Sequence, residues 1–446
     1  MSSNDLISLA NEVANQKENI RQAIVTAGVE CPEETPLADY PGKISQIQNR
    51  VSEVGTKVFY AGDDSSLTQE STTYTVPTTY AAIAPNGLSG YTNLQSVTMQ
   101  NVTSAMDSAF AGNKNLTTIN APLCKYYGAN ALKDTGLEGA YSNSIADSFG
   151  ANCFSNNTTI TSFDLANVRF IGASCFAGCN KAESISIPNV ERIGARAFVN
   201  FGNNRYDSSS QLQKFDFSAP KVKIIGTDAF SGNLALQSVD APKAKEIWRG
   251  AFYGCENLTS VNLPEVEQLD TYALWVSSDN SKVSEFYLPQ CVYLGEYALY
   301  NRSFSKLTIK DGCYIGPYAV SASGLLTEVV GKPSYIGKYA FQYQTKLTTI
   351  DLSQATYIGN YAFSDSALDV IDLSSCISIE QWAFSGSITA SSKMWLPSTC
   401  TSVSSQSSSN IRIFTDVTDA SSRPSGWSNL GNTWYYGQTY EDFLKA

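Results

Sequence analysis

Side chains that could carry out acid–base or nucleophilic chemistry are distributed unusually in this sequence. Histidine is absent from all 446 residues. A Ser-His-Asp triad, a Cys-His pair and a histidine-ligated metal site are therefore excluded. Ten cysteines are present, but no Cys-x-x-Cys occurs, and the closest pair is Cys175 and Cys179. These spacings favour neither a zinc site nor a redox motif.

The cysteines instead follow recurring phenylalanines. Cys153 and Cys175 each directly precede a phenylalanine, and Cys179 and Cys255 each follow one by three residues. Free cysteine is among the most frequently buried residue types. We therefore expect free cysteines that act as small, buried apolar fillers.

Polar residues that stand between two apolar strand residues are the remaining candidates for chemistry. They are expected to point outward from a sheet. The candidate binding residues on this outward strand face are Asp164, Asp216, Asp240, Asn262, Tyr287, Asp351, Asp372 and Trp395. Asp216 is expected one strand from Asp240, and Asp351 one strand from Asp372.

Such carboxylate pairs could hold Ca²⁺ or act as a general acid and base. Calcium usually takes six or more oxygens from a shaped loop, and catalysis needs a pocket with perturbed pKa values. A flat strand face supplies neither, so we expect no catalytic residue, no metal and no cofactor. The outward polarity could serve solubility alone, or it could form an extended ligand-binding face.

Tyrosines crowd one region of the chain. Tyr287, Tyr293, Tyr297 and Tyr300 lie within 14 residues. Aromatic side chains with polar tips are enriched at recognition surfaces. The alternative is that tyrosine replaces phenylalanine or leucine in degenerate parts of the sequence.

A tandem repeat positions all of these residues. Phe154 and Phe176 are 22 residues apart, as are Phe230 and Phe252. Each unit also contains an apolar-x-x-apolar-x-apolar pattern, whose alternation predicts a short strand with one buried face. An Ile-Gly pair before the Ala-Phe pair, as at Ile336-Gly337, predicts a turn and a short helical or 3₁₀ piece. The period lies in the leucine-rich-repeat range.

The consensus IGxxAFxxCxxLxxIxLPxxVxxIG resembles the BspA-like leucine-rich repeats over residues 91–400. The resemblance implies a repeat solenoid, with a parallel β-sheet and short helical or 3₁₀ convex segments. Residues 51–90 are expected to form a β-rich linker and N-terminal cap. Residues 401–446, which are rich in Trp and Tyr, are expected to form a C-terminal cap.

Residues 1–50 predict a short α-helical module. Its apolar positions, at three- and four-residue steps, are Leu6, Leu9, Val13, Ile20 and Ile24. Such a helix could pack on its own chain, or it could dock on another protein or oligomerise as a dimer or trimer. With the Pro-Glu-x-Thr-Pro and Tyr-Pro-x-Lys-Ile segments that follow, it resembles a module of bacteriophage tail and fibre proteins.

Charge and hydropathy limit the partners. A net charge of −11 argues against nucleic acid and anionic membrane surfaces. The sequence contains no run of 18 apolar residues, so we expect no membrane-spanning helix. The first residues do not resemble a secretory signal peptide.

These observations favour a non-enzymatic virion protein, as a fibre, tip or decoration protein. Its solenoid would bind a host-surface protein or glycan, and its N-terminal helix would bind other virion proteins or itself. The alternative is a BspA-like adhesin on a bacterial cell surface. A polysaccharide-active enzyme is a remote third possibility.

Overall fold

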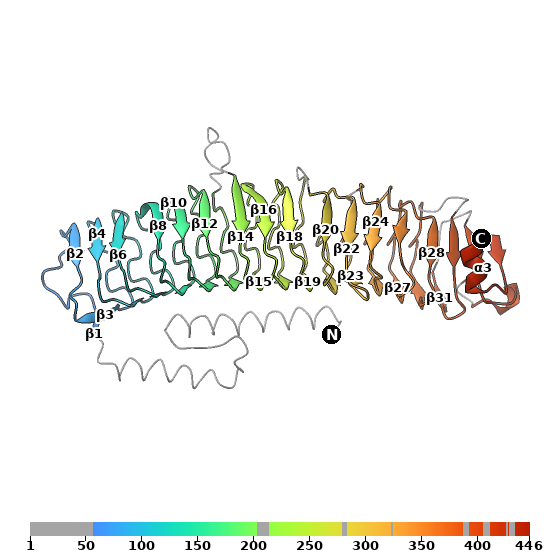
Figure 1. Ribbon diagram of the computed structural model, residues 1–446, viewed down its shortest axis with the longest axis horizontal. Coiled ribbons are helices and arrows are strands. Elements are labelled where there is room, and N and C mark those ends of the chain that lie inside the picture. The colour runs from blue at the N-terminus through green and yellow to red at the C-terminus, as the bar shows by residue number, and fades with distance from the viewer. Residues whose placement is uncertain are drawn as a thin grey trace. The chain divides into compact units, whose positions relative to one another are not determined.

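The computed structural model describes residues 57–202, 214–278, 283–322, 324–386, 392–404, 411–424, 427 and 433–446. The predicted N-terminal helix and its five apolar residues lie outside this part of the chain. Contacts divide the chain into two compact units, Met1–Lys221 and Val222–Ala446, hereafter unit 1 and unit 2. Within each unit, the odd-numbered strands up to β31 form one side of a stack of coils, and the even-numbered strands, joined by β33, form the other (Figure 1).

Unit 1 contains two sets of parallel strands. The odd set is β1 (Lys57–Phe59), β3 (Tyr80–Ile83), β5 (Ser104–Ala105), β7 (Tyr126–Tyr127), β9 (Ser148–Phe149), β11 (Phe170–Ile171) and β13 (Arg192–Ile193). The even set is β2 (Thr73–Thr75), β4 (Ser96–Thr98), β6 (Thr118–Asn120), β8 (Glu138–Ser142), β10 (Thr159–Asp164), β12 (Ser184–Ser186) and β14 (Phe215–Ser218). Consecutive odd strands pair in order, so each coil hydrogen-bonds to the next.

Unit 2 repeats the same plan. The odd set is β15 (Ile224–Ile225), β17 (Glu246–Ile247), β19 (Gln268–Leu269), β21 (Tyr293–Leu294), β23 (Tyr314–Ile315), β25 (Tyr335–Ile336), β27 (Tyr357–Ile358), β29 (Ser378–Ile379) and β31 (Ser402–Val403). The other set is β16 (Leu236–Asp240), β18 (Ser260–Asn262), β20 (Glu285–Tyr287), β22 (Lys306–Thr308), β24 (Glu328–Val330), β26 (Thr349–Ile350), β28 (Val370–Asp372), β30 (Lys393–Trp395), β32 (Arg412–Phe414) and β33 (Thr433–Tyr435). The expected parallel solenoid is therefore observed, and it has two strands in most coils rather than one.

The segments expected to be short helices or 3₁₀ pieces are turns instead. The repeated phenylalanine of each unit, such as Phe110, or the Leu or Val in its place, such as Val320, is called the anchor. The residue two positions before the anchor has a positive φ, as at Ser108 (56°) and Tyr318 (54°). The N–H of Ser108 donates to the carbonyl of Ala129 in the next coil at 2.7 Å. Because these donors bond between coils, they cannot form the i→i−4 bonds of an α-helix.

Parallel pairing extends past both limits predicted for the solenoid, residues 91 and 400. β1 already pairs with β3 before residue 91, and β32 pairs with β33 after residue 400. The described helices are η2 (Ala420–Ser422) and α3 (Tyr440–Lys445). Neither is long enough or apolar enough to cross a membrane.

The core is filled by the anchors, whose rings stack from coil to coil. Phe154 lies 5.5 Å from Phe176 at an interplanar angle of 9°, and Phe341 lies 5.2 Å from Phe363. All nine described cysteines are free and buried, which confirms the prediction for them. They are more than apolar fillers, however, because the Cys255 thiol donates to the Phe230 carbonyl at 3.2 Å.

Candidate functional site

The predicted strand face exists, and its carboxylates have different surroundings. Asp164 is exposed at the end of β10, and its neighbours in register are Ser186 and Ser142. Asp216 is exposed in β14. In unit 2, Asn262 Nδ2 donates to Asp240 Oδ1 at 2.7 Å, so this carboxylate is held by an amide.

Asp351 and Asp372 fix turns. Asp351 accepts from the Ser353 N–H at 2.9 Å, and Asp372 accepts from the Ser374 N–H at 3.0 Å and from the Tyr440 hydroxyl. Burial raises the pKa of Asp351, but hydrogen bonds from Ser353 and Lys332 outweigh burial and leave the pKa lowered. Such a carboxylate is not suited to act as a general acid. No group of three metal-binding side chains occurs among the described residues.

The aromatic members of the predicted strand face have different fates. Tyr287 is 57% exposed at the end of β20. Trp395 lies in register with Asp372 but is only 6% exposed, because Phe443 and Tyr440 of α3 pack against it. Trp395 was predicted to be available to a ligand, but α3 covers it.

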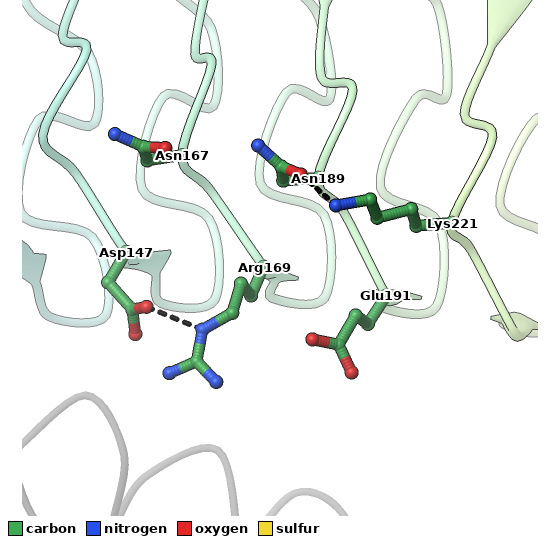
Figure 2. A pocket seen from close by; sticks show the side chains of 6 residues that line it. All are labelled: Asp147, Asn167, Arg169, Asn189, Glu191 and Lys221. Atoms are coloured by element: carbon green, nitrogen blue, oxygen red, sulfur yellow. Dashed lines mark hydrogen bonds and ion pairs between the residues drawn. The ribbon is translucent and has the colours of Figure 1, made fainter.

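A polar pocket of about 420 Å³ lies on unit 1, on turns that precede the odd strands (Figure 2). Its lining residues come from successive coils and are Asp147, Asn167, Arg169, Asn189, Glu191 and Lys221. Arg169 Nε donates to Asp147 Oδ1 at 2.7 Å, which raises the pKa of the guanidinium. Lys221 Nζ donates to Asn189 Oδ1 at 2.6 Å.

The pocket holds two acids and two bases, so it suits an uncharged or zwitterionic polar molecule. It contains no side chain that is activated as a nucleophile. Sequence analysis missed it, although a signal existed: Asp147, Arg169 and Glu191 alternate in charge at intervals of 22 residues. These charged residues lie in turns outside the strand patterns, and the binding residues were predicted from the strand patterns.

Unit 2 carries a second surface, made of stacked tyrosines, which we call the tyrosine surface. Its first column is Tyr293, Tyr314, Tyr335 and Tyr357, the first residues of β21, β23, β25 and β27. Its second column is Tyr272, Tyr297, Tyr318, Tyr339 and Tyr361, all at the positive-φ turn position. Its third column is Tyr253, Trp275 and Tyr300, one residue after each anchor.

Rings within the first two columns stack face to face. Centroid distances are 5.3, 4.5 and 4.7 Å in the first column. They are 5.0, 4.6, 4.7 and 4.9 Å in the second, with interplanar angles of 17° or less. These values match the spacing of hydrogen-bonded strands, so the backbone ladder itself sets the stacking distance.

Contacts at the ring edges join the second and third columns. Tyr297 lies 5.2 Å from Tyr300 and Tyr253 lies 6.2 Å from Tyr272, both nearly perpendicular. Burial, followed by the neighbouring phenols, raises the pKa of Tyr297 to about 12. Tyr297 is therefore neutral at physiological pH.

The predicted tyrosine group is thus divided and extended by the structure. Tyr293, Tyr297 and Tyr300 enter three different columns, whereas Tyr287 lies on an even strand outside the tyrosine surface. The sequence signal for the rest was the recurrence of Tyr at the residue before Ile-Gly and again four positions later.

Comparison with known proteins identifies the repeat. A model of the BspA-type leucine-rich repeat region matches residues 43–138, 81–204, 199–327 and 315–425. No curated protein matches the chain significantly. The family match identifies a repeat region, and no enzyme family is indicated.

Solved structures of similar proteins include three bacterial examples. A leucine-rich repeat protein from Bacteroides ovatus is 15% identical, with a TM-score of 0.40, over 82% of this chain and 83% of that one. A leucine-rich cell surface protein from Faecalibacterium prausnitzii is 15% identical, with a TM-score of 0.30, over 88% and 93%. The pneumococcal vaccine antigen PcpA is 15% identical, with a TM-score of 0.28, over 88% and 89%. Shared function does not follow from similarities this low.

Proposed function

The chain belongs to the BspA-type leucine-rich repeat family, and from that premise we propose that it is a non-enzymatic recognition protein of a bacterial cell surface. In this role it acts as an adhesin that binds a host-surface protein or glycan. The virion setting expected from residues 1–50 has no support from the family match. The adhesin alternative is therefore the better account.

The observation that carries this proposal is the tyrosine surface of unit 2. Tyrosine is enriched at interfaces because its ring supplies apolar contact area and its hydroxyl supplies a hydrogen bond. Each ring in the first two columns is held between stacked neighbours from adjacent coils or at the end of such a stack. Binding therefore costs little side-chain entropy, which is the usual advantage of a pre-organised surface.

The strand face and the unit 1 pocket contribute less to this proposal. On the strand face of unit 2, Lys306 pairs with Glu328 at 3.0 Å and Lys332 with Asp351 at 3.3 Å. Exposed pairs of this kind give little stabilisation, and they keep the face soluble. We assign recognition to the tyrosine surface for this reason.

Binding of the labelled full chain to host epithelial cells tests the proposal. The double variant Tyr318→Ala, Tyr339→Ala removes two central rings and is expected to weaken adhesion by about tenfold or more, as for interface hot spots. The matched control is Asp164→Ala on the strand face of unit 1, and circular dichroism of both variants checks folding. Loss of adhesion in the control alone would assign recognition to the strand face instead.

A second measurement separates the two settings. Protease treatment of intact producing cells should cleave the chain if it stands on the cell surface. Recovery of the chain only in purified phage particles would instead restore the virion alternative.

A further inference from the structure

We propose that the tyrosine surface binds a neutral linear polysaccharide that runs along the columns, from coil to coil. This inference rests on the proposed recognition function and narrows its ligand to one chemical class. Three features of the described residues carry it: the periodicity of the rings, the atoms that they present and the charges between them.

The first feature is periodicity. In the second column, Tyr297, Tyr318 and Tyr339 repeat at 4.6 and 4.7 Å, and the rings of the first column repeat at 4.5 to 5.3 Å. A ligand that makes the same contact in each coil must itself be a repeating chain. Most folded proteins outside the repeat classes have no such repeat on their surface, whereas a linear homopolymer does.

The second feature is the set of atoms left for a ligand. Within the columns the ring faces cover one another, so the ring edges and the hydroxyls are what a ligand can contact. Some of these hydroxyls also bond to one another, as those of Tyr297 and Tyr318 do. A phenol hydroxyl both donates and accepts hydrogen bonds. Sugar hydroxyls do the same and can satisfy both capacities. An extended proline-rich peptide offers carbonyl acceptors, but its prolines have no N–H to donate.

The third feature is charge. The residues that directly precede the five second-column tyrosines are, in order, Thr271, Glu296, Pro317, Lys338 and Asn360. This row contains one acid and one base, so its charges are not all of one sign. An anionic polysaccharide would need a row of cations, so a neutral chain fits better.

The third column adds a place for sugar stacking. Tyr253 stacks on Trp275 at 4.5 Å, and it is 38% exposed. The equivalent position in the preceding coil is Ser231, so no aromatic ring continues the column there. The C–H face of a sugar ring can pack against an aromatic face that ends a stack in this way.

Calorimetry with cello-oligosaccharides and manno-oligosaccharides of two to six sugars tests the inference. At least one series is expected to bind the full chain, with affinity rising with length as more coils are contacted. The double variant Tyr318→Phe, Tyr339→Phe keeps the stacked rings and removes two hydroxyls. It should bind about tenfold more weakly with an unchanged melting temperature, as the loss of two hydrogen bonds implies.

Tyr287→Phe is the matched control, because it removes a tyrosine hydroxyl from the strand face, outside the tyrosine surface. It should bind like the parent chain. If no neutral oligosaccharide binds but the Tyr318→Ala, Tyr339→Ala variant still weakens cell adhesion, the glycan proposal is overturned and the recognition function stands. If a proline-rich peptide competes with cell adhesion and no oligosaccharide does, the glycan proposal is likewise overturned in favour of a peptide ligand. Unchanged adhesion in the alanine variant would overturn both proposals.

Discussion

At the residue scale, a glycine column explains why coils can pack so closely. A Cβ on Gly337 would lie 2.6 Å from the Gly316 carbonyl carbon and 2.6 Å from Pro317 N. A Cβ on Gly316 would lie 2.8 Å from the Gly295 carbonyl carbon. The Ile-Gly pairs of the sequence are thus needed less for the turn itself than for backbone contact between coils.

Gly337→Ala is therefore expected to destabilise unit 2 by about 1–3 kcal/mol, the usual cost of forcing extra volume into a packed site. Urea unfolding measures the change. Lys346→Ala is the control, since this side chain is exposed and should stay within about 0.5 kcal/mol of the parent. Equal stability of both variants would contradict the close approach.

Buried thiols and half-buried phenols make stability depend on alkaline pH. Burial raises the pKa of Cys124 to about 12 from 9.0, and the pKa of Tyr357 to about 12 from 10.0. Both groups bind their protons more tightly in the folded chain. Their contribution is complete below the unfolded pKa values and is lost as pH rises through the folded ones.

The free energy of unfolding should therefore stay level from about pH 7 to pH 8 and fall from about pH 9 towards pH 12. Urea titrations across this range measure it. The tyrosine absorbance change on ionisation, followed in the same samples, should occur later in the folded chain than in the urea-unfolded chain. Coincident ionisation curves would show that these phenols are not buried.

At the element scale, the period and the alternating strand pattern were enough to predict the parallel solenoid. They were not enough for the odd strands, because a two-residue strand such as Tyr335–Ile336 is too short to show alternation. The turns were mistaken for helices for a related reason. Ser108 and Tyr318 take positive φ without being glycine, since hydrogen bonds to the next coil hold them there.

The site was predictable only in part for the same reason. Recurrence placed Asp164 and Tyr287 on the strand face, where both are exposed. Recurrence could not show that α3, from a distant part of the sequence, covers Trp395. Nor could it show that tyrosines four positions apart form separate columns.

Helix α3 is expected to hold the last described coils together. Phe443 is fully buried between Trp395 and Phe414, and Lys393 Nζ donates to the Phe443 carbonyl at 2.7 Å. Phe443→Ala should cost about 3–5 kcal/mol locally, as expected for a buried ring. It should also raise quenching of Trp395 fluorescence by acrylamide. Leu444→Ala is the control, because Leu444 is 57% exposed.

At the scale of the whole molecule, the two units offer different surfaces. Unit 1 presents a polar pocket of mixed charge, and unit 2 presents the tyrosine surface. With a net charge of −11, the chain is expected to repel other polyanions, which agrees with a neutral ligand.

Oxidative footprinting of the full chain, free and bound to host cells, tests recognition by the tyrosine surface. Binding should protect Tyr297, Tyr318 and Tyr339 from oxidation and leave Tyr287 as reactive as before. Protection of Tyr287 with no change at the tyrosine surface would instead place recognition on the strand face.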